Sequence, residues 1–527
     1  MRPGRTWWAG TSILSFAVVI VLGSSMAVAR AGERVSAEPA RPKIGLVLAG
    51  GGAKGAAHVG VLKVLEEMRI PIDVVVGTSM GSIVGGLYAS GMRPDDIERA
   101  IREIDWVDVF EDAPDRADRS FRRKADDALY VFKAKPGFSD GKIKVPLAVV
   151  QGQKFDLQLN RLTQGVSAVG DFDRLPIPFR AVAADLETGE QVVLKSGSLP
   201  RALRASMAVP GAFNPVEMDG RLLVDGGIAN NIPVSVARDL GADVLIVSEL
   251  GTDMLTRDEI ESGLDVAAQM VNFLFVINSR QQLKTLAEDD VRISVQLGDI
   301  GAGSFERIRE AIPLGEQAAR VAADKLNRYA LAEAGYRQHV AARSLPRTGP
   351  RQVDFVRIEN RSGVSDEVIA ARLSVKAGEP LDVAELEHDI QQIYGLEIFE
   401  SVRYALVEED GKSGVVVQAT EKSWGPGYLQ TGLITSSNFE GDAVFRLGLT
   451  YTRTAINPLN GEWRTGAQIG DEPGLFTEIF QPFDPAAHYF GFARAGYQTQ
   501  NVNNFDDDNN KIAEMRAKGF GVELGVG

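Results

Sequence analysis

The chain has 527 residues, which is too long for one hydrophobic core, so we expect three or more folded units. Its 57 Lys and Arg residues against 71 Asp and Glu residues give a net charge of −14, which argues against nucleic acid as a partner, because phosphate binding needs a basic face. The sequence contains no cysteine, so disulfide bonds and thiolate metal sites are excluded.

The first 29 residues have the pattern of a secretory signal peptide. Two arginines precede an apolar run over 13–22, and a small-x-small cleavage site ends at Ala29. The apolar run is too short to cross a bilayer core of ~30 Å, although an uncleaved membrane anchor remains an alternative. We expect cleavage near Ala29 or Ala31, with residues 30–42 as a polar linker.

Strand-like and helical patterns alternate over residues 43–330. This alternation predicts an α/β domain with a mostly parallel sheet flanked by helices. Residues 105–170 are charged and irregular, and their pattern fits either a lid over a pocket or an ordinary insertion. The expected strands lie at 44–48, 74–76, 179–183, 221–224 and 244–247, and the expected helices at 55–68, 200–208 and 305–331.

A nucleophile-elbow pattern, G-x-S-x-G, follows the strand expected at 74–76. It consists of Gly77, Thr78, Ser79, Met80 and Gly81. A serine on a sharp strand-to-helix turn needs glycine at both flanking positions, because a Cβ there would collide with the strand and the helix. The serine would then lie at a helix N-terminus, where the dipole and free amides stabilise negative charge.

The glycine-rich segment from Gly50 to Gly55 follows the first expected strand. It also satisfies G-x-G-x-x-G, and Asp73 lies about 18 residues beyond Gly55, so a dinucleotide-binding fold is an alternative. A single match of this kind is weak, and it leaves the Ser79 elbow unexplained. Alanine in place of lysine after Gly55 excludes a P-loop.

A third motif, Asp225-Gly226-Gly227, ends the hairpin strand expected at 221–224. The two glycines allow a tight turn from which the carboxylate projects. A serine hydroxyl is a weak nucleophile until a neighbouring base takes its proton, and Asp225 can be that base if burial raises its proton affinity. The four histidines include His58, which could instead complete a Ser-His-Asp triad, but we expect it to pack or hydrogen bond.

Together and in this order, the three motifs resemble those of the patatin-like phospholipase family over residues 43–330. The resemblance implies that Ser79 is the nucleophile, that Asp225 is its partner in a Ser-Asp dyad, and that no cofactor and no metal takes part. The backbone of Gly50, Gly51 and Gly52 would form the oxyanion hole. The remaining motif positions are Lys54, a basic position of the loop, and Gly55, Gly77, Gly81, Gly226 and Gly227, the last of which is alanine in many members.

Residues 331–350 read as a second linker, and a compact pattern follows over 351–421. A strand, two helices and two strands are expected there, at 353–358, 366–373, 383–393, 402–407 and 414–419. This β-α-α-β-β order resembles a polypeptide-transport-associated (POTRA) domain. The resemblance implies a periplasmic module of the outer-membrane assembly and secretion families.

From Gly425 onward, apolar and polar residues alternate. Phe445, Leu447 and Leu449 alternate with polar or small residues, and a similar run follows the Asn460-Gly461 turn. Runs of about ten such residues are typical of transmembrane β-strands, while a soluble sandwich with one wet face is the alternative. About six runs precede the last residue, so we expect residues 422–527 to be the N-terminal part of an antiparallel outer-membrane β-barrel.

The whole order resembles the patatin-like autotransporters of the type V secretion group. That resemblance implies a lipid acyl hydrolase, of phospholipase A or lysophospholipase type, that acts on phospholipid or lysophospholipid. It also implies export to the outer membrane, with the catalytic domain on the periplasmic or the exterior side, and the outer-membrane assembly machinery as a partner. The alternative is a transport or assembly protein whose N-terminal domain is a passenger of little catalytic importance.

Overall fold

The computed structural model describes residues 41–130, 135–139, 141–251, 254–343, 352–437, 443–506 and 511–527. The predicted signal peptide and nearly all of the predicted first linker lie outside the described residues. The segment Pro42–Gly527 forms one compact unit by its internal contacts. Within the described part of the chain, no helix combines the length and the apolar character that crossing a membrane requires.

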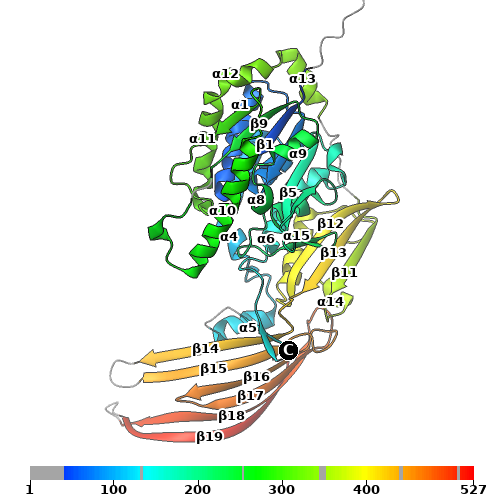
Figure 1. Ribbon diagram of the computed structural model, residues 1–527. Coiled ribbons are helices and arrows are strands. Elements are labelled where there is room, and N and C mark those ends of the chain that lie inside the picture. The colour runs from blue at the N-terminus through cyan, green and yellow to red at the C-terminus, as the bar shows by residue number, and fades with distance from the viewer. Residues whose placement is uncertain are drawn as a thin grey trace, which may run out of the picture. The chain divides into compact units, whose positions relative to one another are not determined.

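The N-terminal part of this unit is built on a mixed sheet (Figure 1). Five neighbouring strands, in the order β10-β9-β1-β2-β5, run parallel, while β6 and β8 pair with β5 in the antiparallel sense and β7 extends β8. The predicted strands and the mostly parallel sheet are therefore confirmed, with an antiparallel edge. The strands are β1 (Ile44–Leu48), β2 (Val74–Thr78), β5 (Phe179–Asp185), β6 (Gln191–Leu194), β7 (Val216–Met218), β8 (Arg221–Asp225), β9 (Val244–Glu249) and β10 (Val291–Ser294).

Helices cover both faces of this sheet because its central strands bury both of their faces. In β1, Leu46 and Leu48 belong to one hydrophobic cluster and Val47 to another. The first cluster contains residues of α1, α2, α3, α7 and α11, and the second contains residues of α9. The helices are α1 (Ala57–Glu67), α2 (Met80–Ala89), α3 (Pro94–Glu103), α7 (Leu199–Ser206), α8 (Gly227–Asn230), α9 (Val234–Asp239), α10 (Gly263–Leu283) and α11 (Ile308–Val321).

The long helical stretch expected over 305–331 is present but divided into several helices. α11 is capped at its C-terminus by Ala322, whose amide is shared between the carbonyls of Ala318 and Ala319, a tightening typical of a helix end. Beyond it lie α12 (Ala323–Leu326) and α13 (Glu333–Ala341). Helix α13 lies within the predicted linker 331–350. Just before this helix the chain contacts the α/β domain, where the amide of Leu331 donates a hydrogen bond to the carbonyl of Arg69.

The predicted strand–helix–helix–strand–strand order follows. It consists of β11 (Phe355–Arg361), α14 (Asp366–Ala370), α15 (Val383–Tyr394), β12 (Phe399–Glu409) and β13 (Lys412–Glu421). In the three-stranded sheet, β13 lies in the middle, parallel to β11 and antiparallel to β12. Its core, which includes Ile390 and Phe399, is separate from those of the α/β domain. The identity of this module as a POTRA domain stays a prediction.

The C-terminal region is an antiparallel sheet in which each strand pairs with the next along the chain. Alternate residues lie on opposite faces, so that Leu447 and Ile469 are exposed while Thr450 and Arg464 are buried. The alternation predicted from Gly425 onward is thus present, and the barrel stays a prediction. The strands are β14 (Gly427–Ser437), β15 (Ala443–Arg453), β16 (Glu462–Gly470), β17 (Gly474–Pro482), β18 (Phe490–Phe505) and β19 (Lys511–Val526).

The irregular segment 105–170 is an insertion that joins the α/β domain to the C-terminal sheet. Its hairpin pairs with the edge of β14 through Gly137 and Tyr428. α5 also contacts this sheet through a charged pair, since Asp126 accepts a hydrogen bond from Arg464 at 2.8 Å. The elements of this insertion are α4 (Trp106–Glu111), α5 (Phe121–Leu129), β3 (Gly137–Ser139), β4 (Lys142–Lys144) and α6 (Gln153–Thr163).

Candidate active site

A sharp turn between β2 and α2 carries Ser79. β2 ends at Thr78 and α2 begins at Met80, so Ser79 alone makes the turn, with φ 53° and ψ −129°. A positive φ costs a residue with a side chain about 1–3 kcal/mol and persists only where the surroundings impose it. The side chain of Ser79 is only 4% exposed. The fold therefore holds Ser79 in a strained backbone conformation at the N-terminus of a helix.

The glycines on either side make this turn possible. A Cβ on Gly77 would lie 2.3 Å from the carbonyl oxygen of Gly81. A Cβ on Gly81 would lie 2.4 Å from the carbonyl oxygens of Leu48 and Ala49, at the end of β1. Both glycines of the predicted elbow are thus required by the backbone that surrounds them.

Asp225 lies at the end of β8, and the chain turns immediately after it. Its Oδ1 accepts a hydrogen bond of 2.8 Å from the amide of Gly227. A Cβ on Gly226 would lie 2.1 Å from the carbonyl oxygen of Val182, so this glycine lets the turn pack directly on β5. The predicted motif thus fixes the carboxylate of Asp225 inside the domain, where it is 1% exposed.

Burial raises the pKa of Asp225 to about 6, because the charged carboxylate loses its solvation. Hydrogen bonding from the side chain of Ser79 and from the Gly227 amide acts in the opposite direction. Oδ2 of this carboxylate nevertheless makes no well-aligned hydrogen bond with any residue described. Long or poorly aligned contacts of this kind are common in unliganded catalytic sites.

The glycine loop after β1 lies against the same turn. A Cβ on Gly50 would lie 3.1 Å from the Cβ of Ser79, which places the loop beside the predicted nucleophile. The amide of Gly50 donates to the carbonyl of Asn231 at 3.2 Å, so it is already occupied. The amides of Gly51 and Gly52 make no hydrogen bond with any part of the chain that the structure describes. These two groups are the donors left for an oxyanion.

The remaining motif residues have packing roles. A Cβ on Gly55 would lie 2.3 Å from Cγ of Met80, so this glycine lets the loop pack on the start of α2. Lys54 is buried, and its ammonium group donates to the carbonyl of Gly251 at 3.5 Å. A Cβ on Gly227 would lie 2.9 Å from the ring of Phe275 in α10.

His58 is neutral and structural, as expected. Its Nε2 contacts the carbonyl oxygen of Ala49 at 2.8 Å, which requires a proton on Nε2, and its Nδ1 accepts from the hydroxyl of Ser248 at 2.9 Å. Complete burial lowers the pKa of His58 to about 4. Both ring nitrogens are therefore used to join the ends of β1 and β9, and neither contacts Ser79.

Asp73, the acidic residue of the dinucleotide alternative, accepts a hydrogen bond of 2.7 Å from the amide of Ile44. This contact ties its carboxylate to the start of β1. A ribose-binding carboxylate would instead project beyond the end of a strand. The glycine loop therefore fits the Ser79 turn better than it fits a dinucleotide.

One residue of the site had no sequence signal. Ser206, at the end of α7, accepts a hydrogen bond of 2.9 Å from the amide of Ser79 and donates one of 2.5 Å to the carbonyl of Val182. In the sequence it is a serine inside a helical pattern with no turn motif around it. Only the fold brings it to Ser79, which lies 127 residues earlier.

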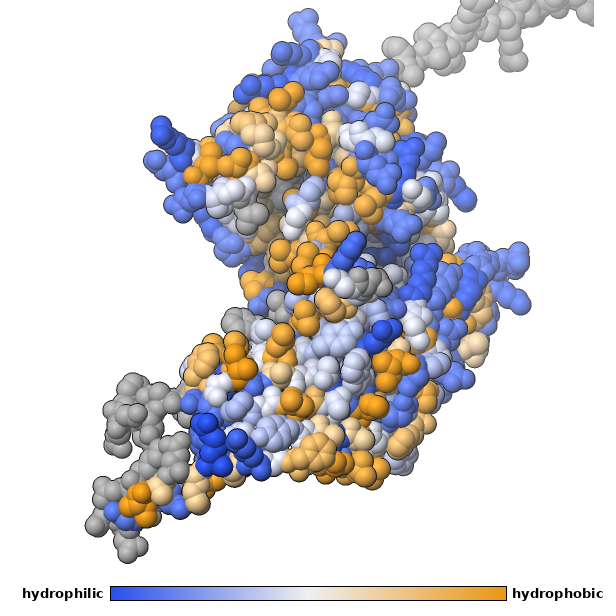
Figure 2. All heavy atoms as spheres, turned by 60° about the horizontal axis from the view of Figure 1, so that its bottom comes forward, coloured by the Kyte–Doolittle hydropathy of each residue, from blue (hydrophilic) through white to orange (hydrophobic). Residues whose placement is uncertain are grey.

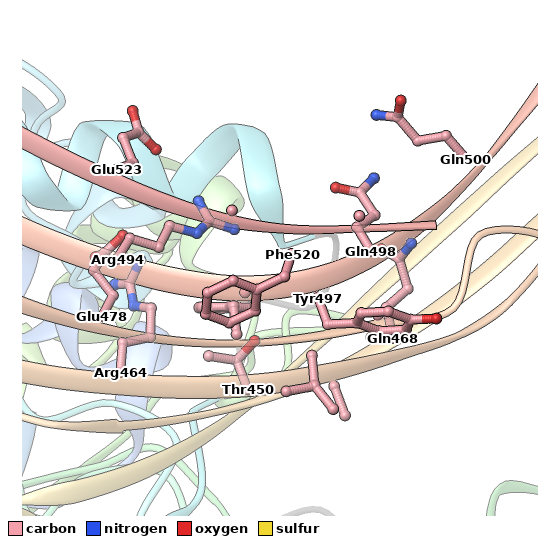
Figure 3. Close-up of a pocket in the computed structure, with 18 of the residues that line it drawn as sticks. Thr450, Arg464, Gln468, Glu478, Arg494, Tyr497, Gln498, Gln500, Phe520 and Glu523 are labelled. Atoms are coloured by element: carbon pink, nitrogen blue, oxygen red, sulfur yellow. The ribbon is translucent and has the colours of Figure 1, made fainter. Parts of the chain in front are cut away.

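A large hollow lies elsewhere, on the polar face of the C-terminal sheet. It has a volume of about 910 Å³. Figure 3 shows Arg464, Glu478, Arg494 and Glu523 on neighbouring strands of that sheet. None of its lining residues belongs to the segments around Ser79 or Asp225, so this hollow is not the candidate active site. Within the described ranges, no group of three or more acidic or histidine side chains is placed to hold a metal ion.

Known proteins resemble the part of the chain that contains this site. Residues 46–238 match the family model described as patatin-like phospholipase. A patatin-like phospholipase domain-containing protein of Caenorhabditis elegans is 36% identical over 235 residues, 44% of this chain and 15% of that protein. Patatin-like phospholipase domain-containing protein 6 of Homo sapiens is 34% identical over 226 residues, 42% of this chain and 14% of that protein. The chain thus spans about a seventh of these relatives.

Further proteins also match part of the chain. An uncharacterized NTE family protein of Mycobacterium tuberculosis is 34% identical over 209 residues, 40% of this chain and 49% of that protein. Among solved structures, VipD from Legionella pneumophila has a TM-score of 0.29 at 17% identity, covering 54% of this chain and 67% of that one. Residues 46–238, which contain the Ser79 turn, are thus similar to patatin-like phospholipase domains.

Proposed function

We propose that this protein is a serine lipid acyl hydrolase, of phospholipase A or lysophospholipase type, in which Ser79 and Asp225 are the catalytic pair. The observation that carries the proposal is that both turns lie beside the same strand, since Thr78 is opposite Val182 of β5 and Asp225 is opposite Ala183. The carboxylate of Asp225 is buried there, and its pKa is raised to about 6. A carboxylate with this pKa is ionised at neutral pH, yet it binds a proton more readily than an exposed aspartate does.

In the first half of the reaction, Oγ of Ser79 attacks the carbonyl carbon of an ester while Asp225 takes the hydroxyl proton. The oxygen of the tetrahedral intermediate becomes negative, and the amides of Gly51 and Gly52 are the donors available to it. The N-terminus of α2 adds a favourable dipole. The intermediate then expels the alcohol, which takes the proton from Asp225, and an acyl group remains on Ser79.

In the second half, water replaces the alcohol. Asp225 takes a proton from the water molecule as it attacks the acyl carbon, and the same amides stabilise the second oxyanion. Collapse of this intermediate breaks the bond to Ser79 Oγ, which recovers its proton from Asp225. The products are a carboxylic acid and the free enzyme, so no cofactor is consumed.

A lipid substrate is supported by the α10 apolar stripe, a row of exposed apolar side chains on the helix that packs against the Asp225 turn. Asn278 of this helix donates to the carbonyls of Gly227 and Ile228 at 2.7 and 3.1 Å, which fixes α10 beside that turn. Figure 2 shows hydrophobic side chains at the surface of the molecule in several places. The exposed members of the α10 apolar stripe are Val266, Met270, Phe273, Leu274 and Ile277.

The proposal is tested by labelling the full chain with a fluorophosphonate, which forms a covalent bond with activated serines. Mass spectrometry of wild-type protein should find the probe on Ser79. The Ser79→Ala variant should take up no probe and should not release fatty acid from phospholipid vesicles. Labelling of another serine, or fatty-acid release that persists in Ser79→Ala, would refute the proposed nucleophile.

We also propose that the chain is exported by its N-terminal signal, and that residues 351–421 and 422–527 are a POTRA-like module and part of an outer-membrane barrel. The support is the parallel pairing of β11 with β13 and the alternation in the C-terminal sheet, which leaves Phe445, Leu447 and Leu449 exposed. Cell fractionation and N-terminal sequencing test this proposal. Recovery of the intact N-terminus in the cytoplasm would contradict it.

The C-terminal sheet also favours a second candidate function, in which the protein is mainly a transport or assembly device. In that case a partner such as the outer-membrane assembly machinery matters more than the ester bond. The two functions differ in one measurement. If hydrolysis is the main function, Ser79→Ala should change the phospholipid and fatty-acid content of the cell. If transport is the main function, this content should stay unchanged.

A further inference from the structure

Ser206 lies at a junction of three elements. It is the last residue of α7, and its side chain is fully buried. The hydroxyl accepts from the amide of Ser79 at 2.9 Å and donates to the carbonyl of Val182 on β5 at 2.5 Å. Ser206 thus connects the turn after β2 to the neighbouring strand by two hydrogen bonds.

The sheet explains why this connection is needed. β5 lies between β2 and β8, with Thr78 opposite Val182 and Asp225 opposite Ala183. At Ser79 the chain leaves the sheet for α2, so its amide can no longer continue the ladder with β5. The hydroxyl of Ser206 takes the place of the missing ladder partner.

The backbone beside Ser206 holds the other half of the catalytic pair. The amide of Asp225 donates to the carbonyl of Ala208 at 2.9 Å, and the amide of Gly226 donates to the carbonyl of Ser206 at 3.3 Å. The end of α7 therefore contacts both the Ser79 turn and the Asp225 turn. A shift of this segment would change the distance between the two side chains.

We propose that Ser206 is a positioning residue that holds Ser79 at the distance from Asp225 at which a proton can be transferred. The inference rests on the proposed serine hydrolase function. The physical reason is the strained φ of Ser79: a buried amide without a partner would favour a relaxed turn, and the relaxed turn would move Oγ away from the carboxylate. Displacements of about 1 Å in a catalytic pair can reduce rates about 100-fold.

The test compares Ser206→Ala with a second buried serine. Ser248→Ala is the matched control, because Ser248 is also fully buried and also hydrogen bonds through its hydroxyl, but to His58. Both variants should lose similar amounts of thermal stability. Only Ser206→Ala should lower kcat, by about 10- to 100-fold, with KM for a short-chain ester unchanged. Its rate of fluorophosphonate labelling should fall by the same factor.

Two further variants test the same role in case Ser206→Ala does not fold. Ser206→Thr keeps the hydroxyl and should restore most of kcat. Ser206→Cys keeps the volume but offers a weak acceptor, so it should show the reduced kcat even if Ser206→Ala does not fold. Equal kcat in Ser206→Ala and Ser248→Ala, or full activity in Ser206→Cys, would overturn the positioning role.

The same measurements distinguish loss of the positioning role of Ser206 from loss of the proposed hydrolase function. If wild-type protein shows no hydrolysis that depends on Ser79, the proposed function fails and Ser206 has no reaction to support. If wild type is active, Ser79→Ala is inactive and Ser206→Ala has wild-type kcat, only the positioning role fails.

Discussion

Gln153 of α6 pairs with the backbone of Val402 on β12 through both atoms of its side-chain amide. Its Nε2 donates to the carbonyl of Val402 at 2.6 Å, and the amide of Val402 donates to its Oε1 at 2.8 Å. β12 is an edge strand of its sheet, so the side chain takes the place of a further strand. Leu157, one turn further along α6, lies in the core of the same module. The helix therefore belongs to the α/β domain and also completes the neighbouring module.

Gln153→Leu should lower the free energy of unfolding by about 2 kcal/mol or more, because it leaves a buried amide and a buried carbonyl of Val402 unpaired. Urea denaturation of the full chain measures the change. Gln164→Ala, at an exposed position just beyond the same helix, is the control and should stay within about 0.5 kcal/mol of wild type. Equal midpoints in the two variants would show that the hydrogen bonds between Gln153 and Val402 do not stabilise the protein.

Asp225→Asn should reduce ester hydrolysis by about 100- to 10,000-fold, since an amide of the same shape cannot take the proton of Ser79. Steady-state kinetics on a short-chain ester measures the loss. Ser90→Ala serves as the control, because Ser90 follows the far end of α2 and its hydroxyl donates only to the carbonyl of Leu87. Activity in Asp225→Asn comparable to that of the control would exclude Asp225 as the base.

The pH dependence of activity should follow the raised pKa of Asp225, which is about 6. The carboxylate must be ionised to act as a base, so kcat/KM should rise through about pH 6 and level off above it. A pH–rate profile from pH 4.5 to 8.5 measures this limb. A midpoint near pH 4, the value of an exposed aspartate, would mean that the buried carboxylate does not control the reaction.

The same group should make the fold less stable at neutral pH than in mild acid. Its pKa is higher in the folded state than the ordinary value of 3.8, so folding favours its protonated form, and stability falls as pH rises from about 4 to about 6. Asp225→Asn removes the buried charge and should raise stability at pH 8 by an amount on the order of 2 kcal/mol. Thermal unfolding of both proteins at pH 5 and pH 8 measures the difference. A variant no more stable than wild type at pH 8 would contradict the desolvation argument.

A feature of this site could be predicted from the sequence when the residues that form it lie close together along the chain. Ser79 and Asp225 each lie in a short motif whose glycines are explained by neighbouring backbone, so the local pattern was sufficient to predict the two turns. Ser206 and the occupied amide of Gly50 depend on partners far along the chain, and such contacts leave no local pattern. The same reason hid the role of α5, because Asp126 contacts Arg464, which lies 338 residues later.

The fold shows the same limit. The parallel strands were predictable because both of their faces are buried, which gives continuous apolar runs such as β1 and β9. The helix α13 was missed because none of its residues is fully buried, so it has no apolar face to indicate a helix. Its place is set instead by the contact of Leu331 with Arg69.

Gly226→Ala should prevent correct folding or lower the free energy of unfolding by about 3 kcal/mol, since the new Cβ would meet the carbonyl oxygen of Val182 at 2.1 Å. Gly170→Ala is the matched control, because nothing lies within 4 Å of a Cβ at that position. Soluble yield and urea midpoints of the two variants test the difference. Normal stability of Gly226→Ala would show that the Asp225 turn can move away from β5.

Charged substitutions in the α10 apolar stripe should separate lipid surfaces from dissolved esters. Met270 and Phe273 are 51% and 38% exposed, so Met270→Glu and Phe273→Glu should fold, and each adds a charge whose transfer to an apolar surface is unfavourable. Fatty-acid release from phospholipid vesicles should fall at least about 10-fold, while hydrolysis of a soluble short-chain ester should stay within about two-fold of wild type. Val340→Glu, at a 43% exposed position on α13, is the control and should change neither rate. Equal loss on both substrates would place the damage in the catalytic turn, and no loss on vesicles would exclude the stripe as a lipid contact.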